Sequence, residues 1–191
     1  MPLLGIMASA ASGRSAPTNS YFPISSFTVP SGGLSSITIG GIPQIYSHLQ
    51  IRMLARATTT DQGIHNIWMR YNGDTTTACT SHWLYSTGAT SLLGNYYNNA
   101  IGTLVAMIPD VLAGVGFFGS TIIDILDYTS VDKYKTLKTL SGSDCNGAGN
   151  VYSATGLYPS FNAVNSITLT PLSGTTPKFA EYSNISIYGV Y

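Results

Sequence analysis

Residues 46–56, YSHLQIRMLAR, decide the fold. Apolar side chains occur at every second position of this stretch, at Leu49, Ile51, Met53 and Ala55. Polar side chains lie between and beyond them, at His48, Gln50, Arg52 and Arg56, and Leu54 is an apolar interruption of the polar face. A period of two places alternate side chains on opposite faces of a β-strand. The stretch therefore predicts a strand with one buried and one polar face.

Short strand patterns separated by turn signals continue along the chain. They cover residues 67–71, 82–85, 104–108, 121–128, 134–141, 166–170 and 184–191. Asn72-Gly73-Asp74 predicts a hairpin turn, residues 143–150 predict a turn or loop, and residues 86–102 predict a long surface loop. About eight to ten strands without a long amphipathic helix indicate an all-β protein, and we predict a jelly-roll-like antiparallel β-sandwich.

Residues 1–26 differ from the rest of the chain. They are rich in Ser, Ala, Pro and Gly, show no periodicity and contain one charged residue, Arg14. Such a segment has few side chains with which to build a core of its own, and ordering it costs about 1 kcal/mol or more per residue. We therefore predict an extended N-terminal arm over residues 1–26 that docks onto a neighbouring subunit. The sandwich domain is expected over residues 27–191.

Charged residues make up only 8% of the sequence, and the formal net charge is zero. An average soluble domain has roughly 25% charged residues, so most of the surface here must be neutral and hydrogen-bonding. Such a surface is typical of a protein packed into an assembly, and it also suits weak binding of glycans. The absence of a positive field argues against a nucleic-acid partner.

The sequence also argues against a membrane partner. No apolar run reaches the roughly 18 residues that span a bilayer. The apolar start, MPLLGIM, lacks the basic residues that open a signal peptide, so we expect no cleavage there.

The carboxylates form no catalytic pair in the sequence. Asp124 and Asp127 are close, but three positions along a strand place their side chains on opposite faces. We expect them to form hydrogen bonds and a turn before Lys133 instead. No GxSxG motif or other local pattern selects a catalytic triad. We therefore predict a non-enzymatic protein without catalytic residues.

The residues that bind zinc in other proteins are scattered here: His48, His65, His82, Cys79 and Cys145. Neither a CxxC nor an HxxxH spacing occurs among them. Two distant cysteines leave their pairing open, and two reduced thiols are the simpler interpretation. We expect no metal site and no cofactor.

Tyrosine is abundant, with 13 residues against 6 Phe and 2 Trp. Tyrosine buries area while keeping a polar tip, which suits interfaces and sugar-stacking surfaces. The candidate ligand or partner patch is the run Asn95, Tyr96, Tyr97, Asn98 and Asn99 in the predicted loop. The alternative is that these tyrosines only pack the loop onto the sandwich.

Five segments together resemble β-sandwich structural proteins of tailed bacteriophages, often those of aquatic bacteria. They are residues 37–56 (ITIGGIPQIYSHLQIRMLAR), 67–74 (IWMRYNGD), 82–85 (HWLY), 122–142 (IIDILDYTSVDKYKTLKTLSG) and 167–189. The order and spacing of these pieces carry the resemblance, since no single piece is specific. Gly40-Gly41 falls where the pattern alone predicts the end of a strand, which leaves that strand boundary open.

The resemblance implies a virion component on the outer surface of the capsid or tail. The first hypothesis is a capsid decoration (cement) protein that binds the major capsid protein through its arm. The second is a tail fibre or tip component that binds a host surface glycan. Such proteins are expected to be homo-oligomers, often trimers, and they bring no catalytic residues to carry over. A lectin or carbohydrate hydrolase is the alternative from another class.

Overall fold

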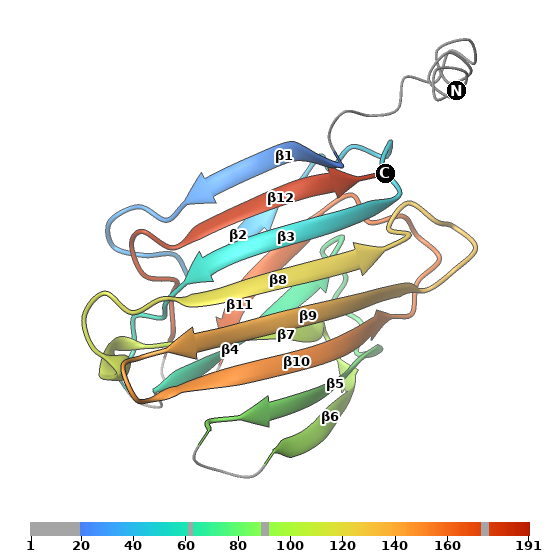
Figure 1. The fold of residues 1–191 in the computed structure, drawn as a ribbon. Coiled ribbons are helices and arrows are strands. Elements are labelled where there is room, and N and C mark those ends of the chain that lie inside the picture. The colour runs from blue at the N-terminus through green and yellow to red at the C-terminus, as the bar shows by residue number, and fades with distance from the viewer. Residues whose placement is uncertain (1–19, 61–62, 89–91, 173–175) are drawn as a thin grey trace, which may run out of the picture.

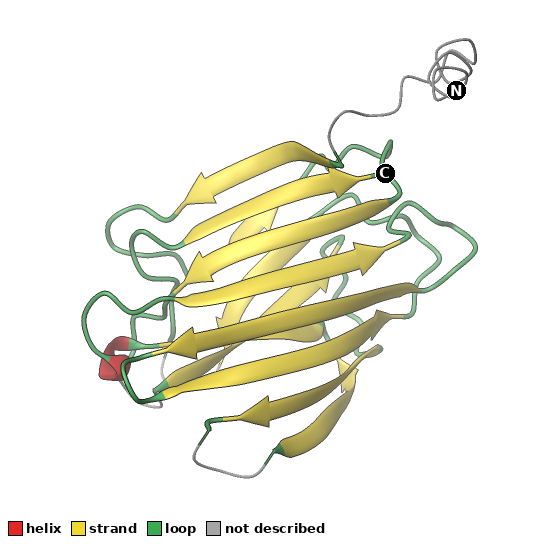
Figure 2. Ribbon diagram, viewed as in Figure 1, coloured by secondary structure: helices red, strands yellow, loops and turns green. Residues whose placement is uncertain are grey.

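The computed structural model describes residues 20–60, 63–88, 92–172 and 176–191, and these residues form an all-β sandwich (Figures 1 and 2). The segment between β7 and β8 holds a single 3₁₀ turn, η1 (Val111–Ala113). In the described part of the chain, no helix is long and apolar enough to cross a membrane. The strands are β1 (Tyr21–Thr28), β2 (Ile37–Ile39), β3 (His48–Ala55), β4 (Ile64–Tyr71), β5 (Cys79–Ser86), β6 (Leu93–Ala100), β7 (Thr103–Pro109), β8 (Gly119–Leu126), β9 (Lys135–Asp144), β10 (Gly149–Tyr158), β11 (Ile167–Leu172) and β12 (Asn184–Val190).

Two antiparallel sheets make up the sandwich. The large sheet has the order β1-β12-β3-β8-β9-β10-β5-β6, and the small sheet has the order β2-β11-β4-β7. If the β5–β6 and β9–β10 pairs are set aside, the remaining strands give β1-β12-β3-β8 facing β2-β11-β4-β7. This alternation of the chain between two four-stranded sheets is the jelly-roll topology. The predicted fold class is therefore confirmed, and two inserted hairpins widen one sheet on the same side.

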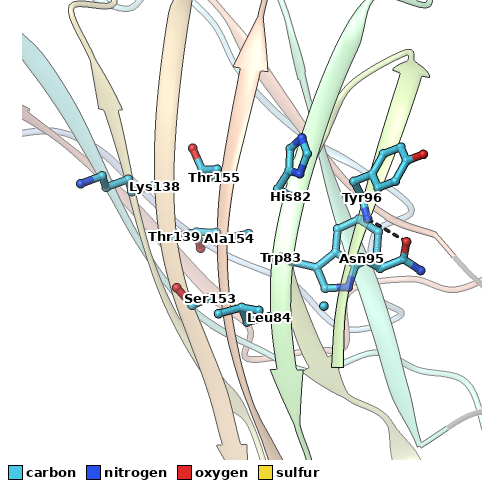
Figure 3. Close-up of a pocket in the computed structure, with 11 residues that line it drawn as sticks. His82, Trp83, Leu84, Asn95, Tyr96, Lys138, Thr139, Ser153, Ala154 and Thr155 are labelled. Atoms are coloured by element: carbon cyan, nitrogen blue, oxygen red, sulfur yellow. Dashed lines mark hydrogen bonds between the residues drawn. The ribbon is translucent and has the colours of Figure 1, made fainter. Parts of the chain in front are cut away.

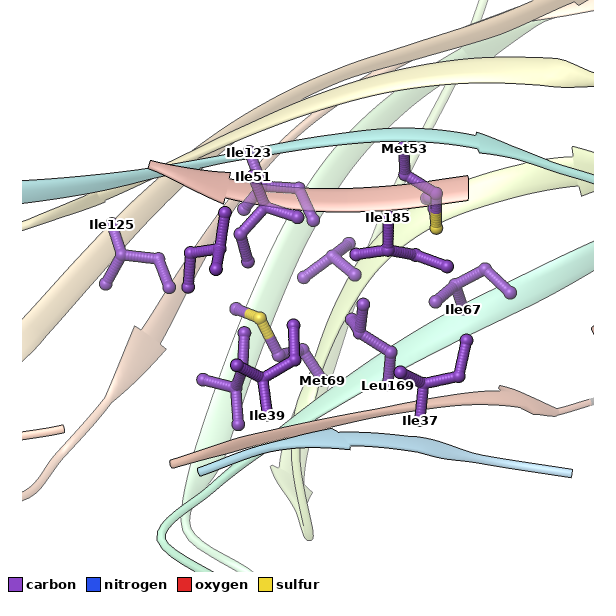
Figure 4. Close-up of a cluster of buried hydrophobic side chains, with 14 of the residues drawn as sticks. Ile37, Ile39, Ile51, Met53, Ile67, Met69, Ile123, Ile125, Leu169 and Ile185 are labelled. Carbon is purple, nitrogen blue, oxygen red and sulfur yellow. The ribbon is translucent and has the colours of Figure 1, made fainter. Parts of the chain in front are cut away.

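The core lies between the two sheets and contains the alternating side chains of β3. Leu49, Ile51 and Ala55 are fully buried and Met53 is nearly so. Figure 4 shows Ile51 and Met53 of the large sheet facing side chains of the small sheet, such as Met69 and Leu169. Burying an aliphatic side chain of this size stabilises the fold by about 1.5–3 kcal/mol. The period-two pattern of residues 46–56 was thus interpreted correctly.

The inserted strands have a smaller cluster of their own. Leu104 of β7 and Tyr152 of β10 are fully buried, and partly buried aromatic residues from β4 and β5 pack around them, among them Trp68 and Trp83. The Tyr152 hydroxyl donates a hydrogen bond to the Leu104 carbonyl at 3.1 Å. This cluster fixes β10 and β5 to the edge of the small sheet, whereas β6 lies beyond it and its residues 93–99 are all exposed.

The boundary between arm and sandwich differs from the prediction. Residues 1–19 of the predicted arm lie outside the described residues. Tyr21–Thr28 form strand β1, which pairs with β12 of the same chain. The sandwich therefore begins at Tyr21 and not at residue 27, because the Ser- and Pro-containing stretch YFPISSFT pairs as an edge strand despite its weak apolar pattern.

The turn at Asn72-Gly73 forms, but it does not make a hairpin. Both residues have positive φ, 52° and 67°, and Asp74 N–H donates to the Tyr71 carbonyl at 2.8 Å. The next strand, β5, lies in the other sheet, so the turn begins a crossing between sheets. The Asn72 side chain accepts hydrogen bonds from the backbone of Asn165 and Ser166, which binds this crossing to the segment before β11.

Candidate functional site

The three histidines lie in three separate environments. His48 Nδ1 accepts a hydrogen bond from Asp127 N–H at 3.0 Å, and the His82 ring stacks on a tyrosine of β6. His65 is fully buried beside the equally buried Asp110, with 3.2 Å between Nε2 and Oδ2. Within the described ranges, no three His, Cys, Asp or Glu side chains converge on a metal-sized site.

The buried pair of His65 and Asp110 was not predicted from the sequence. Asp110 also accepts hydrogen bonds from the backbone N–H groups of Gly63 and Leu112, at 2.9 and 2.8 Å. It thereby caps the 3₁₀ turn η1 and fastens it to the segment that leads into β4. The pair is closed off from solvent, and the hydrogen bonds of Asp110 to Gly63 and Leu112 hold two loops together.

Asp124 and Asp127 have different partners, in agreement with the expectation that they serve hydrogen bonding and a turn. Asp124 Oδ1 accepts from Gln50 Nε2 at 2.8 Å, on the side of β8 that is turned away from the small sheet. Asp127 has a φ of 48° at the turn after β8, and its Oδ2 lies 2.7 Å from Lys133 Nζ. The hydrogen bond and positive charge of Lys133 lower the pKa of Asp127 below its usual value.

The two cysteines do not form a disulfide, and the buried one is poorly suited to chemistry. Cys79 and Cys145 are both unpaired, so the interpretation as two reduced thiols is confirmed. Burial, helped by the nearby carboxylate of Asp74, raises the pKa of Cys79 to about 11. A thiol with that pKa is protonated at neutral pH and is a poor nucleophile.

A broad apolar surface lies on the large sheet, on the face turned away from the small sheet. We call this face the outer face. Ile122 of β8 and Leu140 of β9 lie directly opposite each other on it. Diagonal neighbours on β3, β10 and β5 extend the pair into a line across five strands. This outer-face row consists of Leu54, Ile122, Leu140, Val151 and Leu84, and all five side chains are exposed.

The outer-face row borders a hollow. Ser120 and Gly142 lie opposite each other in the register and have little side-chain bulk, so the sheet surface is low there. The resulting cavity, about 560 Å³, is lined by Leu54, Ile122, Leu140 and Val151 among others. The hollow thus combines aliphatic residues and a small-residue floor with polar side chains such as Arg52 and Asn184.

A polar row runs beside the apolar one and is ordered by its own contacts. The Arg52 guanidinium carbon lies 4.9 Å from the ring centroids of both Tyr21 and Tyr188. Arg52 Nε donates to Gln50 Oε1 at 2.8 Å, and Gln50 in turn donates to Asp124. The charged side chains of Arg52 and Asp124 are thus both held by neighbours on the outer face.

A second hollow on the outer face includes part of the patch that was predicted from the sequence (Figure 3). Its volume is about 700 Å³, and we call it the polar-aromatic hollow. The Tyr96 ring, 54% exposed, stacks on His82 with 5.6 Å between ring centroids. The other lining residues are Trp83, Leu84, Gly94, Asn95, Lys138, Thr139, Ser153, Ala154 and Thr155.

The prediction of a loop was wrong for the candidate patch, because Asn95, Tyr96, Tyr97, Asn98 and Asn99 lie on strand β6. Alternation along the strand separates the two tyrosines. Tyr96 lines the polar-aromatic hollow, whereas the Tyr97 ring packs on the other side, 4.7 Å from Trp83 and 5.0 Å from Trp68 between centroids. Packing onto the sandwich, the alternative interpretation, thus describes Tyr97.

Comparison with known proteins adds little to this geometry. No protein-family model matches the sequence, and no curated protein matches it. Among solved structures, the crystal structure of the infectious bursal disease virus VP2 subviral particle is similar at 13% sequence identity, with a TM-score of 0.11. The match covers 89% of this chain and 39% of the VP2 chain, so this chain spans well under half of that chain's length. A likeness this weak carries no argument, and the fold rests on the strand pairing of the chain itself.

Proposed function

We propose that this chain is a non-enzymatic structural protein of a tailed-phage particle, a capsid decoration (cement) protein that exposes a jelly-roll knob. The observation that carries the proposal is the outer-face row, five exposed aliphatic side chains in line on one rigid sheet of a chain with 8% charged residues. The partner is the major capsid protein, on the resemblance of the sequence to virion proteins.

The physical argument starts from the cost of the outer-face row in water. An aligned group of exposed aliphatic side chains is characteristic of an interaction site, whereas single exposed apolar residues are ordinary. Burying such a row against a partner gains about 25 cal/mol for each Å² of apolar area removed from water. The sheet beneath it is fixed by strand pairing, so little ordering entropy is lost on binding.

The predicted tether over residues 1–26 is not part of this support. Residues 1–19 lie outside the described part of the chain, and the rest of the tether belongs mostly to β1. The proposal therefore assigns docking to the outer face, and it leaves a contribution from the N-terminal residues to be tested by deletion.

Counting the copies of this chain in purified particles tests the proposal. Quantitative mass spectrometry against the major capsid protein is expected to give hundreds of copies per particle. A handful to a few dozen copies would replace the capsid assignment by a tail assignment, and absence from purified particles would overturn the virion assignment as a whole. Hydrolysis of a host polysaccharide by the purified protein would overturn the non-enzymatic assignment.

The polar-aromatic hollow favours a second candidate, a tail fibre or tip component that binds a host surface glycan. A sugar ring stacks on an exposed aromatic face, and its hydroxyls need neighbouring hydrogen-bonding groups. The exposed Tyr96 ring offers the face, and Lys138, Ser153 and Thr155 offer the polar groups. Tyr96→Ala is expected to weaken glycan binding at least tenfold, whereas Tyr182→Ala, an exposed tyrosine outside the hollow, is expected to leave it unchanged.

A further inference from the structure

The two edges of the large sheet differ in how they meet solvent. Strands β1 and β6 lie at opposite edges, as Figure 1 shows. An edge strand exposes backbone groups that pair readily with another chain, and proteins block such edges with proline or a bulge. β1 has both: Pro23 lacks an N–H group, and the register with β12 is irregular between Pro23 and Ser25. This edge is therefore poorly suited to pairing.

The β6 edge lacks these features over its first five residues. Leu93 to Tyr97 pair in regular register with Tyr85 to Ser81, and the irregularity begins only beyond Tyr97. The stretch LGNYY contains neither proline nor a charged residue. All five residues are exposed, and Leu93 is 57% exposed. This is a regular and neutral strand edge, and no strand among the described residues pairs with its open side.

We infer that this edge pairs with the same edge of a second copy of the chain. The two β6 strands run antiparallel about a two-fold axis at Asn95, and the two large sheets join into one. The inference rests on the proposed structural function, because it names the self-association by which copies meet.

The backbone of β6 supports a register centred on Asn95. The Tyr96 N–H donates to Asn95 Oδ1 at 2.8 Å, a side-chain acceptor on its own strand, so this N–H faces the open side of β6 and not β5. Backbone groups that face one side of a strand recur at every second residue. Gly94 and Tyr96 therefore share the open side, and the register places Gly94 opposite Tyr96 of the second copy, where they exchange hydrogen bonds.

The side chains are complementary in the same register. Gly94 and Tyr96 lie on the outer face, and the register places the small Gly94 of one copy opposite Tyr96 of the other, so no side chain at that position collides with the tyrosine. Aromatic residues that lie across from an edge glycine are compatible with close strand pairing. On the other face, Leu93 meets Tyr97 of the second copy, whose ring is held in place by Trp83 and Trp68.

Asn95 meets itself at the axis, with about 5 Å between the two Cβ atoms. Two neutral amides at this distance pair without repulsion, as does the rest of this uncharged stretch. The arrangement is a two-fold dimer. This dimer differs from the trimer that the resemblance implies, and the mass of the assembly in sedimentation distinguishes a dimer from a trimer.

Charge substitutions at Asn95 test the inference by sedimentation of the full chain. Asn95→Asp and Asn95→Lys each place like charges opposite each other at the axis, and each is expected to raise the dimer dissociation constant about fivefold or more. An equimolar mixture of the two variants is expected to restore the dimer as a heterodimer. Asn98→Asp is the matched control: its two copies would lie about 20 Å apart along the strands, beyond the screening length of about 8 Å.

The outcomes separate the inference from the proposed function. A wild-type chain that stays monomeric at 100 µM would overturn the inference, and so would a dimer or trimer that neither Asn95 variant weakens. In both cases the copy number in particles still decides the structural function on its own. Weakening by each variant alone together with recovery in the mixture supports the paired edge, because a misfolded variant would not recover on mixing.

Discussion

Ile122 and Leu140 lie directly opposite each other on the outer face of the large sheet, and both side chains remain exposed. Opposed aliphatic residues on neighbouring strands contact each other, and a contiguous group of exposed apolar side chains is typical of an interaction site. The opposite face of the same sheet packs against the core between the two sheets. The pair therefore belongs to a second apolar layer, which the proposed function assigns to contact with an assembly partner.

Leu140→Glu is expected to abolish incorporation into particles without unfolding the chain. Leu140 is 59% exposed, so its replacement is expected to change the free energy of unfolding by no more than about 0.5 kcal/mol. A carboxylate buried unpaired in an interface costs several kcal/mol. Particle occupancy and thermal melting measure the two effects. Val131→Glu, 63% exposed and outside the sheets, is the control, and equal loss of incorporation in both variants would contradict the role of the outer face.

Gly189→Ala is expected to destabilise the sandwich by about 1–3 kcal/mol through overpacking. A Cβ at Gly189 would lie 2.1 Å from Cδ2 of the Tyr46 ring, which covers the end of β12. Adding Tyr46→Ala is expected to remove the penalty of the glycine substitution, which urea denaturation of the single and double variants would measure. Gly40→Ala is the matched control because no atom lies within 4 Å of its added Cβ and its φ is not positive. A large loss of stability there would contradict the steric explanation.

Stability is expected to fall between pH 9 and pH 11. Burial raises the pKa of Cys79 from 9.0 to about 11, so its stabilising effect is complete below pH 9 and is lost as the pH rises through the folded-state value. The full loss from this group is about 3 kcal/mol. Burial also raises the pKa values of Tyr71 and Tyr152, which steepens the loss above pH 10.

Urea denaturation at several pH values measures this dependence. In Cys79→Ala the free energy of unfolding is expected to fall less steeply between pH 9 and pH 11, whatever its value at neutral pH. An unchanged slope would show that the thiol does not titrate between the folded and unfolded states in this range.

The strands that could be predicted from the sequence are those that bury one face and expose the other. β3 has this alternation, and its core residues were identified correctly. β6 was taken for part of a loop because residues 93–99 are exposed on both faces, which leaves no periodicity to detect. The Asn72-Gly73 turn was recognised from its local chemistry, but whether the next strand pairs alongside or crosses to the other sheet is decided by distant residues.

Only part of the candidate site could be predicted from the sequence, because distant residues complete it. Tyr96 was singled out, yet its neighbours Lys138 and Thr155 come from β9 and β10, and His82 comes from β5. Strand register across the large sheet brings them together. The outer-face row is likewise assembled from five strands, and none of its members stands out in its own segment.

Trp83→Ala is expected to loosen β5 and β6 while the jelly roll remains folded. Trp83 packs in the small cluster with Leu104 and Tyr152, whereas the main core lies under β3 and β8. Hydrogen exchange is expected to speed up at the amides of β5 and β6 by tenfold or more and to stay slow in β3, because local opening costs less than global unfolding. Phe161→Ala, an exposed aromatic residue outside both sheets, is the control. Equal acceleration in β3 and β6 would mean that the inserted hairpin and the jelly roll unfold as one unit, which would contradict a separate cluster at the edge of the sheet.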